Sequence, residues 1–143
     1  MKRIVLSLFF LVCVNAYANP FLNVVTESDD IVILVDAKSV IKVGDYVRAW
    51  VIFNFSKPET NHGFKYISEN TLYFFDCDGK EMGKATRMLF AGKNATGESV
   101  TTFSIPVQDI ELGRVEPNSM GDILLKNVCQ RLPTAKSLMP RGR

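Results

Sequence analysis

The segment from Tyr46 to Phe55 constrains the fold more than any other part of the chain, because every second side chain in it is apolar. The apolar set is Val47, Ala49, Val51, Phe53 and Phe55, and the mixed set between them is Tyr46, Arg48, Trp50, Ile52 and Asn54. A β-strand points successive side chains to opposite sides of its sheet, so this alternation predicts a strand. We expect the apolar side to face the core and the mixed side to be partly covered or to meet a partner.

The rest of the chain up to Pro106 predicts further strands of the same sheet. Short runs rich in Val, Ile, Phe, Tyr and Thr are separated by turn sequences, and helical periodicity is absent there. The expected strands are Ile31–Val35, Ser39–Val43, Tyr46–Phe55, Phe64–Cys77, Glu81–Gly92 and Glu98–Ile105, with a loop at Lys57–Gly63 and turns at Asp76–Gly79 and Asn94–Gly97. In Glu81–Gly92 we expect Met82, Met88 and Phe90 on one side and Leu89 on the other. Consecutive hairpins of this kind predict an antiparallel meander sheet.

One helix is predicted near the C-terminal end of the sequence. Ser119 can cap it, and Asp122 suits both that cap and the positive end of the helix dipole. Leu125, Cys129 and Leu132 recur at helical spacing, and a proline follows them. This apolar stripe needs a surface to pack on, and the sheet provides it. The expected fold class is therefore α+β, an antiparallel meander β-sheet with one C-terminal α-helix packed on it.

Residues 1–18 have the pattern of a secretory signal peptide. Lys2 and Arg3 precede an apolar run from Ile4 to Val14, and Ala16-Tyr17-Ala18 supplies a small-x-small cleavage site. The run is too short to cross a bilayer, and no later run reaches spanning length. We therefore expect an exported protein that does not span the membrane and that lies in the periplasm, at the cell surface or outside the cell. Its single domain covers residues 19–133, and residues 134–143 form a flexible basic tail.

Removal of this leader changes the charge of the protein. The chain has 17 Lys and Arg against 15 Asp and Glu, which gives a formal net charge of +2. Lys2 and Arg3 lie in the leader, which contains no acidic residue, so the remaining chain is formally neutral. A neutral domain lacks the positive electrostatic field that attracts nucleic acids and anionic membranes. We therefore expect it to bind neither.

Export also predicts the role of the cysteines. Cys13 lies in the leader, which leaves Cys77 and Cys129 as a pair in an oxidising compartment. We predict a disulfide between them that joins sheet and helix. It closes a loop of about 50 residues, for which the loop-entropy model gives about 4 kcal/mol of stabilisation. The alternative for Cys13 is the lipid-modified cysteine of a bacterial lipoprotein, although Val12 precedes it where such proteins have a small residue.

The sequence shows no recognisable catalytic, metal or cofactor site. Its single histidine, His62, falls in a polar loop, and zinc needs three or four protein ligands. The acid clusters Asp29-Asp30 and Asp76/Asp78 fall at turns, where carboxylates more often serve the backbone geometry. We therefore expect a protein that is not an enzyme and that needs no metal or cofactor.

The mixed side of the central strand is the candidate binding face. Tyr46, Arg48 and Trp50 alternate there, and exposed aromatic side chains beside an arginine are typical of protein-binding hot spots. The alternative is that Trp50 fills the space between the sheet and the helix.

Several segments taken in order resemble the bacterial surface-adhesin protein E family. They are Asp36-Ala-Lys-Ser39-Val40, Gly44 followed by Val47-Arg48-Ala49-Trp50-Val51, Lys57-Pro58, Lys65-Tyr66-Ile67-Ser68, Phe75-Asp76-Cys77 and Pro117-Asn118-Ser119 leading to Cys129. The resemblance covers roughly residues 22 to 131. It implies an antiparallel sheet with a C-terminal helix and a disulfide, in an envelope protein of a Gram-negative bacterium.

The resemblance also implies a function. The named adhesin of this family is a non-enzymatic dimer that binds host matrix and plasma proteins, including vitronectin, laminin and plasminogen. We therefore expect a protein partner and a possible homodimer, with no host-binding residue assigned by the resemblance itself. The alternative is a periplasmic structural component, inhibitor or ligand carrier without host contact.

Overall fold

The computed structural model describes residues 21–132. The signal peptide expected over residues 1–18 and the basic tail expected over residues 134–143 lie outside the described residues. The described part corresponds to nearly all of the expected domain.

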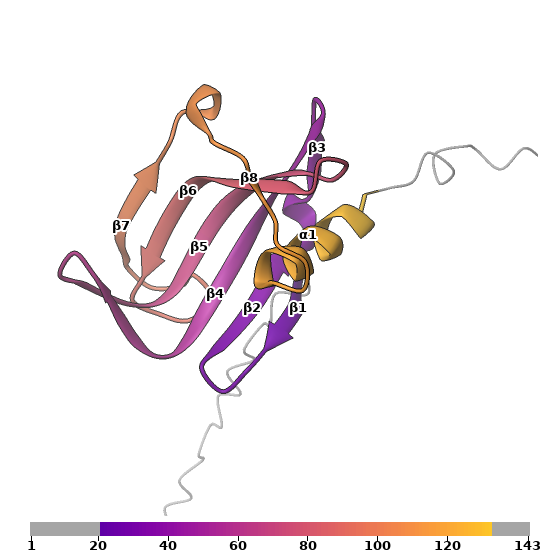
Figure 1. Cartoon of the computed structure of the whole chain (residues 1–143). Helices are drawn as coiled ribbons and strands as arrows, with labels where there is room; N and C mark the ends of the chain where they lie inside the picture. The colour runs from indigo at the N-terminus through magenta and orange to yellow at the C-terminus, as the bar shows by residue number, and fades with distance from the viewer. Residues whose placement is uncertain (1–20, 133–143) are drawn as a thin grey trace, which may run out of the picture.

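Eight strands of the described chain form one antiparallel sheet, as the meander prediction requires (Figure 1). Six of them pair in chain order: β1 (Leu22–Glu27), β2 (Ile31–Asp36), β4 (Tyr46–Asn61), β5 (Phe64–Asp76), β6 (Glu81–Phe90) and β7 (Ser99–Ser104). The two short strands β3 (Ile41–Val43) and β8 (Gly113–Arg114) pair with the starts of β4 and β6. Because the six main strands pair in chain order, short connections suffice for most of the sheet.

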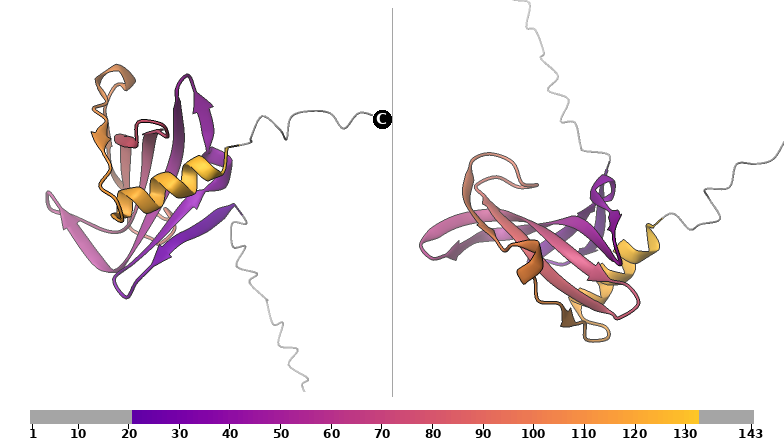
Figure 2. Two further views of the ribbon diagram at one scale, coloured as in Figure 1. Left: turned by 45° about the vertical axis from the view of Figure 1, so that its right-hand side comes forward. Right: turned by 90° about the horizontal axis from the view of Figure 1, so that it is seen from above.

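Helix α1 (Met120–Gln130) lies across one side of this sheet (Figure 2). Its N-terminus is capped as predicted, because the Ser119 Oγ accepts a hydrogen bond from the Asp122 N–H at 3.3 Å. The Asp122 carboxylate in turn accepts from the Asn118 N–H at 2.9 Å and from the Lys126 ammonium at 2.7 Å. These contacts satisfy donors that a helix start otherwise leaves unpaired.

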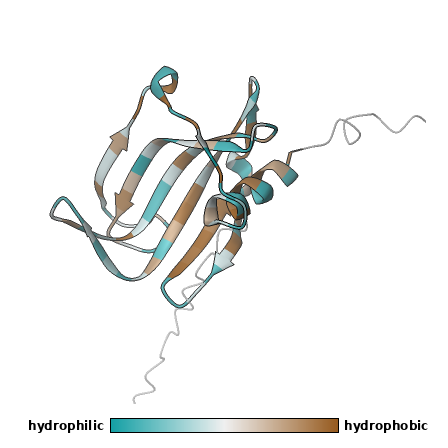
Figure 3. Ribbon diagram, in the orientation of Figure 1, coloured by the Kyte–Doolittle hydropathy of each residue, from teal (hydrophilic) through white to brown (hydrophobic). Residues whose placement is uncertain are grey.

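The core lies between α1 and the side of the sheet that we call the helix face. Hydrophobic residues are concentrated along β2 and β4 beneath the helix (Figure 3). The buried set is Ile33, Val35, Val47, Ala49, Val51, Tyr73 and Phe75 from the sheet and Leu124, Leu125 and Val128 from α1. The apolar alternation of β4 is thus confirmed as the core side of that strand. We call the opposite side of the sheet the far face.

A disulfide joins Cys77, directly after β5, to Cys129 in the last turn of α1. Its Cα atoms are 5.9 Å apart, and the two cysteines are 52 positions apart in the sequence. The predicted pairing is confirmed, and it ties the end of the helix to the sheet on which the helix packs.

The expected loop at Lys57–Gly63 is wrong, because β4 continues through it to Asn61. Strands β4 and β5 pair again from Glu59 with Tyr66 to Asn61 with Phe64. The turn itself consists of His62 and Gly63, which both have positive φ, 46° and 84°. Pro58, which signalled a break, lies in the irregular stretch where the register shifts, so its missing N–H costs no ladder bond.

The expectation that Met82, Met88 and Phe90 share one side of their strand is also wrong. The β5–β6 register shifts between Leu72 and Tyr73, which leaves Ala85 of β6 as an extra residue. A bulge of this kind reverses the alternation beyond it. Met82 therefore lies opposite Phe75 on the helix face, whereas Met88 lies opposite Asn70 on the far face.

Replacement of both disulfide cysteines, C77A together with C129A, should lower the free energy of unfolding by about 4 kcal/mol, since the open chain regains the loop entropy. Urea unfolding followed by circular dichroism measures this loss. An unfolding midpoint equal to that of the oxidised parent would contradict the structural role given to the link.

Candidate binding face

Strand β4 places all three predicted residues on the far face. Tyr46, Arg48 and Trp50 alternate with the buried side chains that α1 covers, so they point away from the helix. Tyr46 and Arg48 are exposed, and Trp50 is half-buried. The structure thus brings the three side chains together on one uncovered stretch of the sheet.

Trp50 does not fill the space between sheet and helix, so that alternative is wrong. The tryptophan lies opposite Leu72 of β5, one position out of phase with Ala49 and Val51, which do face the helix. Its backbone N–H donates a hydrogen bond to the Ser39 Oγ at 2.8 Å. This bond holds the β4 backbone to the turn that precedes β3.

Strand β3 extends this surface with apolar side chains. Val43 pairs with Tyr46 and Ile41 pairs with Arg48, and directly paired residues of an antiparallel ladder project on the same side. Ile41, Val43 and Tyr46 are each about 40% exposed. The pattern of β4 alone does not reveal these neighbours, and the alternation of Ile41 and Val43 beside a tight turn was the available signal.

A groove of about 250 Å³ begins beside Tyr46 and extends under the segment after β7. We call it the far-face groove; it is lined by Val43, Tyr46, Phe74, Val107, Gln108, Ile110 and Leu112. None of these lining side chains carries a charge. Val107, in the second of two short 3₁₀ helices, η2 (Val107–Asp109), is 65% exposed. Because Phe74 pairs with Arg48, the arginine borders the groove.

The opposite end of the far face is covered by the β6–β7 loop. Asn54 and Asn94 exchange two hydrogen bonds of 2.7 Å, from the Asn54 Nδ2 to the Asn94 Oδ1 and from the Asn94 N–H to the Asn54 Oδ1. The Ser68 hydroxyl accepts from the Ala95 N–H at 3.0 Å and donates to the Gly92 carbonyl. The β6–β7 loop thus covers the end of the far face at Asn54 and Ser68, and it does not cover the end that carries Tyr46 and Trp50.

An ion pair with a buried carboxylate and a partly exposed arginine lies on the helix face, past the part that α1 covers. The Arg87 Nη2 lies 2.7 Å from the Glu69 Oε2, and the Glu69 Oε1 accepts from the Thr71 hydroxyl at 2.7 Å. The hydrogen bond to Glu69 raises the pKa of Arg87 above its ordinary value. Burial raises the pKa of the neighbouring Tyr73 phenol, and the charge of Glu69 adds to that shift.

The acidic and histidine residues considered for catalysis are dispersed. The Asp76 carboxylate accepts from the N–H groups of Asp78 and Gly79 at 3.0 and 2.8 Å, which is the turn role expected for it. His62 is exposed at the tip of the β4–β5 hairpin. Within residues 21–132, no three His, Cys, Asp or Glu side chains gather in a way that could hold a metal ion. No helix in that range is long and apolar enough to cross a membrane.

The family model described as surface-adhesin protein E matches residues 21–130. The chain belongs to the surface-adhesin protein E family. The predicted resemblance is thereby confirmed over almost the whole described part of the chain.

Solved structures of Haemophilus influenzae protein E, a protein similar to this one, share its fold. Crystal form II matches with a TM-score of 0.55 at 10% sequence identity, over 68% of this chain and 80% of that chain. The structure from the non-typeable bacterium matches with a TM-score of 0.55 at 11% identity, over 80% and 76%. A comparison with curated protein sequences found no significant match. At these identities the family fold is preserved while most side chains differ.

The placement of Trp50 can be tested through its fluorescence, because it is the only tryptophan of the chain. L125A, which opens a cavity beneath α1, should cost about 2–5 kcal/mol of stability. The native emission maximum and acrylamide quenching of Trp50 should nevertheless match the parent protein. A red shift of the native emission in this variant would place Trp50 next to the helix and contradict the assignment.

Proposed function

We propose that this protein is an exported, non-catalytic binding protein of the bacterial envelope, whose far-face groove holds a protein partner. The observation that carries this proposal is an apolar groove with exposed Val43 and Val107, bordered by Tyr46 and Arg48, on a side of the sheet that α1 leaves uncovered. Membership of an adhesin family supports the same function.

The composition of the groove suits a protein partner. Its apolar lining gains free energy when a partner removes it from water. Tyr46 and Trp50 add large side chains of low conformational entropy, and Arg48 adds five donors that match a carboxylate. We therefore expect the partner to insert an apolar side chain into the groove and to place an acidic side chain near Arg48. Host matrix and plasma proteins are the proposed partners, by similarity to the adhesins of the family.

The proposed location is the periplasm or the cell surface. The predicted leader at residues 1–18 directs the chain out of the cytoplasm. The Cys77–Cys129 disulfide supports this location, because such bonds persist in oxidising compartments.

Protease treatment of intact cells separates this proposal from its alternative. Degradation of the protein from outside supports adhesion, whereas protection until the outer membrane is opened supports a periplasmic structural component, inhibitor or ligand carrier. The far face could also bind a second copy of this chain, which would form the expected homodimer. Size-exclusion chromatography of the parent and of R48E identifies that outcome.

Charge reversal and truncation on the far face should remove binding to the proposed partners. We expect R48E and W50A each to weaken binding to immobilised vitronectin, laminin or plasminogen by about thirtyfold or more, since hot-spot truncations cost about 2 kcal/mol or more. Surface plasmon resonance measures the affinities. The matched control is K65E, which makes the same charge change on the exposed Lys65 of β5, away from the groove.

Circular dichroism of each variant establishes that the fold is retained. If folded R48E and W50A capture the same proteins with the affinity of the parent, the far face is not the binding surface and the proposal is wrong.

A further inference from the structure

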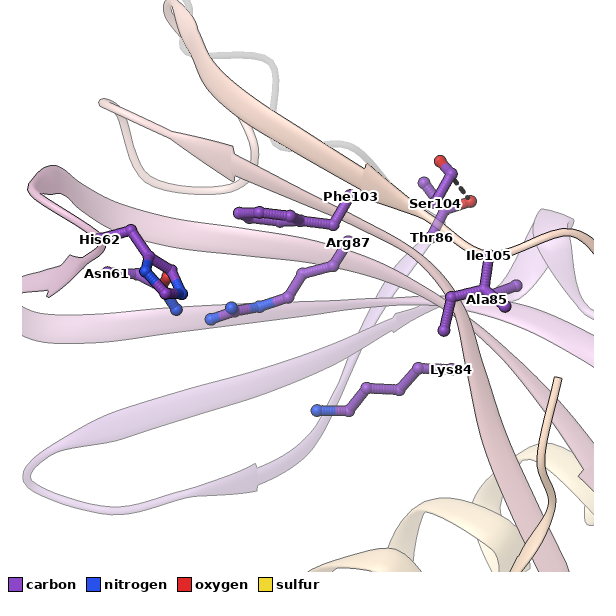
Figure 4. A pocket seen from close by; sticks show the side chains of 9 residues that line it. All are labelled: Asn61, His62, Lys84, Ala85, Thr86, Arg87, Phe103, Ser104 and Ile105. Carbon is purple, nitrogen blue, oxygen red and sulfur yellow. Dashed lines mark hydrogen bonds between the residues drawn. The ribbon is translucent and has the colours of Figure 1, made fainter. Parts of the chain in front are cut away.

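A second hollow lies at the other end of the sheet, between the tip of the β4–β5 hairpin and strands β6 and β7 (Figure 4). It has a volume of about 300 Å³, which is at the lower end of the range for small-molecule sites. Asn61 and His62 come from the hairpin, Lys84 and Arg87 from β6, and Phe103 from β7. None of these residues lines the far-face groove.

The charge of this hollow is positive. Lys84 and Arg87 line it, and no Asp or Glu does. Glu69 balances Arg87, but Lys84 makes no ion pair with any residue in the range 21–132. Its ammonium instead lies 5.9 Å from the centre of the Tyr73 ring. An anionic group entering the hollow therefore meets an uncompensated cation.

Two polar atoms in the walls of the hollow lack hydrogen-bond partners. The Arg87 Nε and the Asn61 Oδ1 are buried, and no atom of the described residues pairs with either. Figure 4 shows the Arg87 guanidinium extending toward Asn61 and His62. A buried polar group without a hydrogen-bond partner destabilises the fold. A ligand that offers an acceptor to the Arg87 Nε–H and a donor to the Asn61 Oδ1 therefore binds more tightly through these hydrogen bonds. The torsion about the Cβ–Cγ bond of Asn61 has a broad range, and rotation about it turns the Asn61 Oδ1 toward the hollow.

The remaining walls are apolar. The ring of Phe103 lies alongside the Arg87 side chain in Figure 4, and it is 41% exposed. Ile105, which is 48% exposed, continues this apolar side. An exposed ring next to cationic groups favours a ligand that carries a flat ring close to its negative charge.

We propose that this hollow binds a small carboxylate that carries a ring and a hydroxyl group. The carboxylate accepts hydrogen bonds from Lys84 and Arg87, the hydroxyl donates to the Asn61 Oδ1, and the ring packs on Phe103. The site is independent of the proposed protein-binding face, which lies on the other side of the sheet.

The test is a titration of the ¹⁵N-labelled chain with four probes, followed by nuclear magnetic resonance. Phenyllactate has all three features; 3-phenylpropionate lacks the hydroxyl, phenyllactamide lacks the charge, and lactate lacks the ring. Phenyllactate should produce saturable shifts at Lys84, at the amide of Phe103 and at the Nε–H signal of Arg87. Phenyllactamide and lactate should each bind about tenfold more weakly, and 3-phenylpropionate several-fold more weakly, as each loses one favourable contact.

Variants connect the binding to the hollow. K84Q, at an exposed position, should weaken phenyllactate binding about tenfold without affecting the fold. The matched control K93Q removes a charge from the exposed β6–β7 loop and should leave the affinity unchanged. The proposal is wrong if phenyllactate gives no saturable shift, if phenyllactamide binds as tightly, or if K84Q has no effect. None of these outcomes bears on the far-face groove, which R48E and W50A test separately.

Discussion

The packing of α1 on one side of the sheet, fixed by the Cys77–Cys129 disulfide, is the constraint on which the rest of the structure depends. A sheet of this size presents two sides, and residues 21–132 contain one α-helix to cover them. The link holds the last turn of the helix to the end of β5, so Leu124, Leu125 and Val128 stay on the helix face. The far face at Tyr46 and the part of the helix face near Arg87 consequently remain uncovered by α1.

Much of this architecture followed from local sequence patterns. Three predictions are confirmed: the alternation in β4, the Ser119 cap and the cysteine pair. The first two rest on neighbouring residues in the sequence, and the third rests on the number of cysteines outside the leader. The misplaced features depend on partner strands instead. Pro58 is tolerated because the β4–β5 register shifts beside it, and the bulge at Ala85 reverses the sides of Met82 and Met88. A single strand's sequence does not reveal such shifts, because they belong to the pairing.

The candidate sites also combine residues that one strand's sequence reveals with residues that only strand pairing brings together. Tyr46, Arg48 and Trp50 were identified from one strand, since alternation alone places them on a common side. Val107 joins them from a segment for which the sequence predicted neither strand nor helix. Lys84, Arg87 and Phe103 meet the hairpin tip only because β4 extends to Asn61. The Glu69–Arg87 pair spans two strands whose register contains the bulge. Contacts between segments distant in the sequence therefore form both the far-face groove and the hollow at the β4–β5 hairpin.

Hydrogen exchange of the oxidised and the reduced protein tests the central claim most directly. If the disulfide holds α1 on the sheet, reduction should speed the exchange of the α1 amides strongly while the central β4–β5 amides keep most of their protection, because those strands have their own ladder. Equal protection of α1 in both forms would show that packing alone fixes the helix and would contradict this account.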